Sequence, residues 1–281
     1  MSAIVIDGKA LAAKIKEQVR SEVEQMTHRP GLAVVLVGDD PASKVYLKGR
    51  KKDCDQCGIF SEEYILPHDI RQEELQELVD KLNGREDIDG ILFQMPMPHH
   101  IDARKVLSAV RPDKDVDCFH AFNMGQLVLG EKAFRPCTPA GILALLDEYG
   151  IDPAGKRCVI VGRSNIVGKP LAMMMVNRDA TVTICHTMTT ELKSSCLRAD
   201  ILIAAAGQRG LITGDMVKEG AVVVDIAINR DPDGNLCGDV VYDEAVTKAS
   251  YITPVPGGVG LVTRAMLMRN TLMAARMHNK V

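Results

Sequence analysis

The sequence has little that would place it in a membrane, in a secretory pathway or on nucleic acid. No apolar run approaches the roughly 18 residues that a membrane span requires. The amino terminus MSAIVIDGKA lacks the charged, apolar and small-residue succession of a signal peptide. The formal net charge of -3 also gives no excess of basic residues, from which a dedicated nucleic-acid binder takes much of its affinity. We therefore expect a cytoplasmic protein with no membrane or nucleic-acid partner.

Cysteine is present, but not in the patterns of disulfide frameworks or zinc sites. The eight cysteines are scattered through predicted strands and helices, as reduced thiols of a cytosolic protein would be. Cys54 and Cys57 form one CxxC pair, yet no second pair and no histidines follow at zinc-like spacing. We expect no metal site.

The first half of the chain alternates predicted helices with predicted strands. GLAVVLVG is almost continuously apolar, which is typical of a parallel strand covered on both faces. Asp40 followed by Pro41 predicts an N-cap and a helix over about 41–56. Four apolar residues recur every four positions and indicate an amphipathic helix over about 9–26: Leu11, Ile15, Val19 and Val23. The other predicted elements are a strand at 59–65, a helix at 72–83 and the strand GILFQMP.

The second half predicts a separate α/β lobe. Residues 112–137 are rich in Pro, Asp, Asn and Gly and lack periodicity, so we interpret them as the connection between two lobes. A helix is predicted at 139–149, and the strand RCVIV then runs into GRSNIVGKP and the helical PLAMMMVNR. Three more buried-type strands follow at βαβ spacing: TVTICH, ADILIAAAG and AVVVDIAINR. The predicted fold class is α/β, with two lobes of which the second is Rossmann-like with a parallel sheet.

The glycine-rich turn after RCVIV is a candidate dinucleotide site. Backbone N–H groups and a helix N-terminus in this setting can hold a pyrophosphate. The common GxGxxG spacing is absent, because Gly162, Ser164 and Gly168 stand here instead. A plain strand-to-helix turn is the alternative, and the βαβ context favours the dinucleotide.

The end of the lobe's second strand indicates which dinucleotide is bound. The acidic residue that usually binds a ribose 2′-hydroxyl is missing, because the chain has His186 and Thr187 there. A carboxylate would repel a 2′-phosphate, whereas Arg163 can pair with one. We therefore expect NADP in preference to NAD, unless Arg163 is only a solvated loop residue.

Seven stretches, in order over nearly the whole chain, resemble the bifunctional methylenetetrahydrofolate dehydrogenase/methenyltetrahydrofolate cyclohydrolase family. They are VGDDPAS, ILFQMPMP, PDKDVDCFH, PCTPAGI, VGRSNIVGKP, DIAINR and YITPVPGGVG. The resemblance implies a folate-side domain at 1–120 completed by a C-terminal helix at 263–281, an NADP domain at 138–260, and a homodimer formed through the NADP domain. It also implies hydride transfer from 5,10-methylenetetrahydrofolate to NADP, and then hydrolysis of the methenyl product to 10-formyltetrahydrofolate.

The resemblance implies roles for particular residues. Tyr46 would stack on the aminobenzoate part of the folate, Gln94 would orient the catalytic side chain, and Asp117 would accept hydrogen bonds from the pterin. Without the resemblance these residues would be a half-buried helix tyrosine, a strand-end polar residue and part of a solvated acidic loop. The PGGVG run would form a wall near folate and cofactor: Pro256, Gly257, Gly258, Val259 and Gly260. The implied cofactor contacts are Gly162, Arg163, Ser164, Ile166, Val167, Gly168, His186, Thr187 and Ile228.

One departure from the family pattern falls in the basic stretch YLKGRKK. The family has a catalytic lysine four residues after the tyrosine, and this chain has Arg50. A guanidinium stays charged and has no acceptor, so Arg50 cannot be a general base. Four further departures near the predicted folate site are Cys118, Ala121, Ala227 and Leu261. We expect the dehydrogenase to be retained and the cyclohydrolase to be weak or lost; the alternatives are that both are retained, or that the chain is a catalytically silent NADP-binding paralogue with a scaffolding or regulatory role.

Overall fold

The computed structural model describes residues 3–39, 41–131 and 134–278. Contacts between residues divide the chain into two compact units. The first unit contains the N-terminal residues through Ala12, Leu127–Gly130 and Thr138–Thr263; the second contains Ala13–Gln126, Glu131–Cys137 and the chain from Arg264 onward. Among the described residues, no helix has the length and hydropathy needed to cross a membrane.

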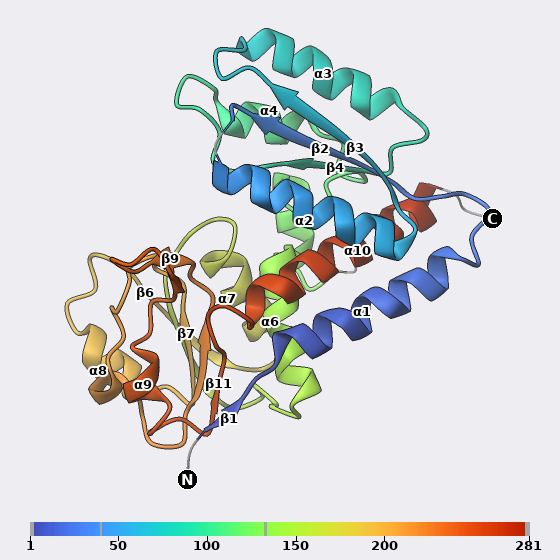
Figure 1. Cartoon of the computed structure of the whole chain (residues 1–281). Helices are drawn as coiled ribbons and strands as arrows, with labels where there is room; N and C mark the ends of the chain where they lie inside the picture. The colour runs from blue at the N-terminus through green and yellow to red at the C-terminus, as the bar shows by residue number, and fades with distance from the viewer. Residues whose placement is uncertain (1–2, 40, 132–133, 279–281) are drawn as a thin grey trace. The chain divides into compact units, whose positions relative to one another are not determined.

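The first unit is built on a six-stranded parallel sheet in the order β1-β11-β8-β7-β5-β6 (Figure 1). Its strands are β1 (Ile4–Val5), β5 (Arg157–Val161), β6 (Thr181–Cys185), β7 (Ile201–Ala204), β8 (Val222–Asp225) and β11 (Tyr251–Ile252). The N-terminal strand β1 joins this sheet because it pairs with β11. Strands β6 and β7 lie on either side of β5, which is the arrangement where doubly wound sheets bind their ligands.

Helices cover both faces of this sheet (Figure 1). One face carries α6 (Cys137–Glu148) and α7 (Gly168–Val176), and the other carries α8 (Leu192–Cys196), α9 (Tyr242–Ala245) and the 3-10 turn η1 (Gly214–Met216). A short antiparallel ribbon is formed by β9 (Asn229–Arg230) and β10 (Leu236–Cys237). On the α8 face, alternate strand residues such as Val159 and Leu202 pack against Cys196 and Met216. Burial on both faces explains the continuous apolar runs of these strands.

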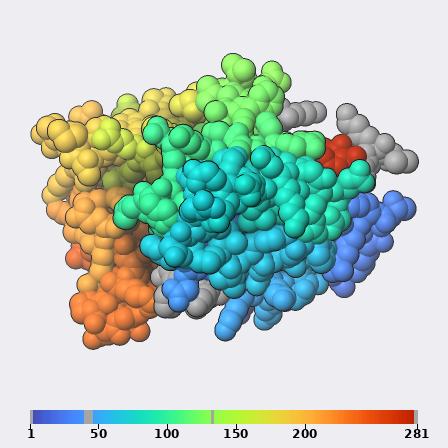
Figure 2. All heavy atoms as spheres, turned by 90° about the horizontal axis from the view of Figure 1, so that it is seen from above, coloured from blue at the N-terminus to red at the C-terminus, as the bar shows by residue number. Residues whose placement is uncertain are grey.

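The second unit has a three-stranded parallel sheet in the order β3-β2-β4. Its strands are β2 (Gly31–Val37), β3 (Phe60–Leu66) and β4 (Gly90–Phe93). Its helices, some shared with the first unit, are α1 (Gly8–Val23), α2 (Pro41–Cys57), α3 (Gln72–Gly84), α4 (Ala103–Ala109), α5 (Ala121–Val128) and α10 (Val259–His278). Helices α3 and α4 pack on one face of the sheet, and α2 lies on the other (Figure 1). Figure 2 shows this unit from above, where α3 and its neighbours, in cyan and teal, form a continuous layer.

Most of the predicted elements are confirmed. All seven residues of β2 are buried, as a strand covered on both faces requires. The predicted helix at 9–26 is α1, whose four apolar residues at a spacing of four are all buried. The helices predicted at 41–56, 72–83 and 139–149 correspond to α2, α3 and α6. The predicted N-cap at Asp40 lies outside the described residues.

Residues 112–137, which lack periodicity and were interpreted as the connection between two lobes, contain the helix α5. The turn that leads into this helix is held by a side chain several residues earlier in the sequence. The Asp115 carboxylate accepts the N–H groups of Phe119 (3.0 Å) and His120 (2.8 Å), which would otherwise lack partners. Since this acceptor lies several residues before the helix, the sequence gives no ordinary N-cap signal.

Gly8, at the start of α1, can be used to test how closely the first unit is packed there. Gly125, in α5 of the second unit, provides a control. A Cβ at Gly8, the first residue of α1, would collide with the carbonyl oxygen of Gly258, whereas a Cβ at Gly125 in α5 meets nothing within 4 Å. We predict that Gly8→Ala lowers the free energy of unfolding by about 1–3 kcal/mol through overpacking. Gly125→Ala, as the matched control, should raise it by about 0.5–1 kcal/mol. Equal effects of the two changes in urea unfolding would contradict the packing described here.

Candidate active site

The basic stretch YLKGRKK on α2 is not a single cationic patch. Lys48, Lys51 and Lys52 are exposed, whereas Arg50 is partly buried. Tyr46 is also partly buried and lies four residues before Arg50, so the two side chains share a face of the helix. The structure therefore separates three solvated lysines from one inward-facing arginine.

A buried carboxylate fixes the helix that carries Arg50. Asp53 is only 1% exposed, and its two oxygens bind Lys16 Nζ of α1 (2.8 Å) and Arg264 Nε of α10 (2.6 Å). Lys16 also donates to Gln56 Oε1 (2.7 Å). These bonds tie α2 to two other helices in the second unit. This network holds the part of α2 that carries Arg50, about one turn from Asp53, and Tyr46, about two turns away.

Arg50 and Gln94, two of the predicted catalytic residues, are in direct contact. Arg50 Nη1 donates to Gln94 Oε1 at 2.6 Å, a short distance typical of a charge-assisted hydrogen bond. The Gln94 amide is held in this orientation because its nitrogen donates to Met95 O (2.8 Å). Arg50 Nε is buried and has no hydrogen-bond partner among the described residues. The guanidinium is thus fixed at one end and keeps unused donor capacity.

Asp117 lies within electrostatic reach of Arg50. Burial lowers the pKa of Arg50, and the negative charge of Asp117 opposes that shift. Burial likewise raises the pKa of Asp117, and Arg50 opposes it. The Cys137 thiol lies beside the Asp117 carboxylate and donates to Val116 O (3.6 Å). The second unit therefore brings together an aromatic ring, a guanidinium, an amide and a carboxylate.

The acidic run that contains Asp117 is not a solvated loop, so that alternative is wrong. Lys114 and Asp115 are 3% and 4% exposed. Lys114 Nζ donates to Arg85 O (2.5 Å), and Asp115 accepts from Asn123 Nδ2 (2.8 Å) besides its two backbone donors. Burial raises the pKa of Asp115 to about 6.

Asp115 and Cys137 lie beside Asp117, although neither was among the predicted site residues. Both stand inside matched stretches, but a buried Cys usually fills a core and an acidic loop usually faces water.

Cys118, a departure from the family pattern, has φ +59°. This left-handed conformation favours glycine over residues that have a side chain. The Cys118 thiol donates to Phe134 O (3.2 Å).

In the first unit, the predicted dinucleotide turn follows β5. Gly162 has φ +138°, and a Cβ there would collide with Ala205 O at the end of β7. A Cβ at Gly168 would collide with Gly162 O, so both glycines are needed where the helix packs against the turn. Ser164 Oγ accepts the N–H groups of Val167 (3.2 Å) and Gly168 (3.4 Å) at the start of α7.

The loop after β6 leaves the sheet beside this turn, because Gly162 N donates to Cys185 O (2.9 Å). His186 is partly buried, and Arg163 and Thr187 are exposed. His186 Nδ1 accepts the N–H of Met188 (3.2 Å). The end of β6 therefore carries an imidazole and a hydroxyl next to the loop of Arg163, and no carboxylate.

The PGGVG run lies in the first unit, whereas Tyr46, Arg50, Gln94 and Asp117 lie in the second. Gly8 N donates to Gly257 O (3.1 Å), so the start of α1 braces this run. Ile228 is 50% exposed, and a Cβ at Gly260 would lie 3.9 Å from its Cδ1.

Two family models match the chain. Residues 6–117 match the catalytic domain of tetrahydrofolate dehydrogenase/cyclohydrolase, and residues 136–279 match the NAD(P)-binding domain of the same proteins. The chain belongs to the tetrahydrofolate dehydrogenase/cyclohydrolase family. The family expected from the sequence motifs is thereby confirmed.

Full-length relatives agree with this membership. The bifunctional protein FolD of Moorella thermoacetica is 54% identical over 98% of this chain and 100% of its own length, and that of Acetivibrio thermocellus is 52% identical over 100% of both. The crystal structure of the bifunctional enzyme FolD from Campylobacter jejuni matches with a TM-score of 0.97, at 47% identity and full coverage of both chains. The FolD structure from Trypanosoma brucei, complexed with NADP cofactor and inhibitor, matches with a TM-score of 0.96, at 38% identity and full coverage of both chains. The predicted two-lobed α/β fold class is also confirmed.

The loops after β5 and β6 predict a preference for NADP. We expect tighter binding of NADP than of NAD, and Arg163→Ala should weaken NADP binding by about 10- to 100-fold because a charge-assisted bond to the phosphate is lost. The affinity for NAD should change little. Lys169→Ala is the matched control, because Lys169 is an exposed cation in the first turn of α7, next to this loop, and already donates to Asn165 Oδ1 (2.7 Å). Equal affinities of the wild type for both dinucleotides, measured by calorimetry, would contradict the prediction.

Proposed function

We propose that this chain oxidises 5,10-methylenetetrahydrofolate to 5,10-methenyltetrahydrofolate with NADP. A hydride passes from the bridging methylene carbon to the nicotinamide, and the positive charge left behind is shared by N5 and N10 of the folate. The cofactor accepts the electrons, so the protein mainly holds two rings in the reactive geometry. Full-length family membership supports this proposal.

We assign the folate contacts to the cluster in the second unit. Asp117 would accept hydrogen bonds from the pterin, and Tyr46 would stack on the aminobenzoate ring. Gln94 would orient the Arg50 guanidinium, with which it is already in contact. The PGGVG run, with glycines that allow close backbone approach, would border the folate and the cofactor.

The second part of the proposal is that the cyclohydrolase is weak or lost. It rests on the arginine at position 50, whose guanidinium is held against Gln94 at 2.6 Å. Hydrolysis adds water to the methenyl carbon, removes a proton from that water and breaks the bond to N5, which leaves 10-formyltetrahydrofolate. A lysine with a depressed pKa can take the proton, whereas a guanidinium has no acceptor. Arg50 would hold charge and orient water without serving as the base.

We also propose a homodimer formed through the NADP unit, and a place in the cytoplasm. Several apolar side chains of this unit are at least 40% exposed and would be available to a second copy: Ile4, Val5, Val176, Leu197 and Leu236. Light scattering on the purified protein would measure the assembly directly, and a monomer at micromolar concentration would rule it out.

The primary test is formation of NADPH by the purified protein with methylenetetrahydrofolate and NADP. Turnover supports the dehydrogenase. Tight binding of NADP without any turnover would instead support a catalytically silent paralogue with a scaffolding or regulatory role.

Asp117→Ala tests the proposed folate contact. We expect folate-dependent turnover to fall at least about 100-fold, because hydrogen bonds to a partly buried charged acceptor are lost. NADP binding should not change, since Asp117 lies in the second unit. Asp113→Ala is the matched control, because Asp113 belongs to the same acidic run but pairs with Arg111 near the surface. A large loss of NADP affinity in Asp117→Ala would contradict the assignment.

Arg50→Lys tests the missing base. We expect cyclohydrolase activity to rise by up to about 10² to 10⁴, the usual contribution of a positioned general base. The dehydrogenase activity should change little. The assay is hydrolysis of supplied methenyltetrahydrofolate, corrected for its spontaneous rate, with Arg50→Ala as the variant that lacks both charge and base. Efficient hydrolysis by the wild type, unchanged in Arg50→Lys, would show that charge and orientation suffice.

A further inference from the structure

A buried carboxylate outside the predicted site residues binds two segments of the first unit. Asp239 is 0% exposed and follows β10. Its Oδ2 accepts the N–H groups of Ala206 (2.7 Å) and Gly207 (2.9 Å). Its Oδ1 accepts from Asn229 Nδ2 (2.9 Å). All three donors are neutral, so the burial of this carboxylate is compensated by hydrogen bonds rather than by a cation.

Both bound segments lie at the carboxyl edge of the sheet. Ala206 and Gly207 follow β7, and Asn229 comes four residues after the end of β8. Ala205, the residue before them, has the carbonyl oxygen that limits position 162 to glycine. Asn229 directly follows Ile228. The Asp239 carboxylate therefore links residues 205–207, which lie beside the predicted dinucleotide turn, to the loop that carries Ile228.

A second buried carboxylate holds Asp239 itself. Asp225, at the end of β8, accepts the N–H groups of Asp239 (3.1 Å) and Val240 (2.8 Å), and also that of Ala227 (3.2 Å). Burial raises the pKa of Asp225 to about 6, and the neighbouring charge of Asp239 acts in the same direction. Keeping two like charges together in the interior is costly, which indicates that this geometry serves more than packing.

We propose that Asp239 is a positioning residue for the dinucleotide: its carboxylate holds the backbone at 206–207 and the side chain of Asn229, and thereby sets the shape of the cofactor site. The inference rests on the proposed function in that it takes NADP as the ligand of this unit. It assigns Asp239 no contact with NADP. Loss of the carboxylate acts by leaving two backbone N–H groups unpaired and freeing the two segments from each other.

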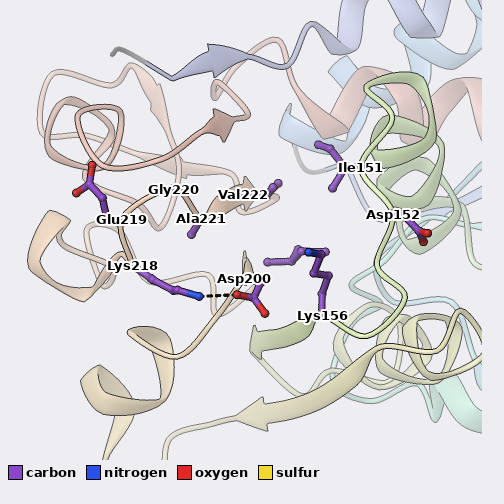
Figure 3. A pocket seen from close by; sticks show the side chains of 10 residues that line it. Ile151, Asp152, Lys156, Asp200, Lys218, Glu219, Gly220, Ala221 and Val222 are labelled. Atoms are coloured by element: carbon purple, nitrogen blue, oxygen red, sulfur yellow. Dashed lines mark hydrogen bonds and ion pairs between the residues drawn. The ribbon is translucent and has the colours of Figure 1, made fainter.

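The opposite edge of the same sheet supplies a matched control. Asp200 Oδ2 accepts the N–H of Arg157 (2.9 Å), and its Oδ1 pairs with Lys218 Nζ (2.5 Å). It borders a cavity of about 190 Å³ at the amino ends of the strands (Figure 3). Asp200 thus anchors backbone to this sheet as Asp239 does, but away from the carboxyl edge.

The experiment measures the Kd of NADP without folate, together with the melting temperature, in Asp239→Ala, Asp239→Asn and Asp200→Ala. We expect Asp239→Ala to raise the Kd at least about tenfold, because its orphaned donors distort the site. In Asp239→Asn the amide oxygen still accepts from Ala206 and Gly207, and a flipped Asn229 accepts from its nitrogen, so the Kd should stay within about threefold. Asp200→Ala should lower the melting temperature and leave the Kd unchanged.

A purely structural role predicts a different pattern, in which the Kd follows the melting temperature in all three variants. That result, or an unchanged Kd in Asp239→Ala, would overturn the inference. If Asp239→Ala does not fold, Asn229→Ala replaces it, with an expected rise in Kd of about three- to tenfold; an unchanged Kd there would also overturn it. Because no turnover is needed, a wild type that binds NADP but does not oxidise folate would refute the proposed function and leave this inference standing.

Discussion

The ion pairs of Asp53 are the constraint on which the catalytic side of the molecule depends. One buried carboxylate binds a cation from α1 and a cation from α10, and so fixes α2 within the second unit. Removing such a carboxylate would leave partly buried cations without their counter-charge, which is strongly destabilising. Tyr46 and Arg50 share one face of α2 because they are four residues apart, and with α2 held there Arg50 reaches Gln94 at the end of β4.

A permanent cation at position 50 has different consequences for the two reactions of this family. Hydride transfer demands geometry and requires no base from the protein, so a fixed guanidinium is compatible with it. Hydration of the methenyl carbon produces a proton that must go to an acceptor. Burial of Arg50 shifts its pKa downward, yet a guanidinium remains protonated at neutral pH, and the negative charge of Asp117 favours the charged form. The same position can therefore support one activity and fail the other.

The sequence predicted the parallel strands well, because burial on both faces leaves continuous apolar runs such as that of β2. At the predicted dinucleotide turn, Gly162 and Gly168 are required by close backbone contacts. Helix α5 was missed, because the Asp115 carboxylate that holds its approach lies upstream of the ordinary capping position. Asp239 was missed for a similar reason: its partners Ala206 and Asn229 come from distant parts of the chain. Only the three-dimensional arrangement shows that such carboxylates are buried and what they hold.

Product stoichiometry distinguishes oxidation with weak or lost hydrolysis from oxidation that is coupled to hydrolysis. The wild-type protein is given methylenetetrahydrofolate and a limiting amount of NADP, and NADPH, methenyltetrahydrofolate and 10-formyltetrahydrofolate are quantified together over time. Spontaneous hydrolysis is subtracted with methenyltetrahydrofolate in buffer alone. If hydrolysis is weak or lost, one methenyltetrahydrofolate accumulates for each NADPH formed. Appearance of 10-formyltetrahydrofolate in step with NADPH, well above the spontaneous rate, would contradict the proposed weakness or loss of hydrolysis.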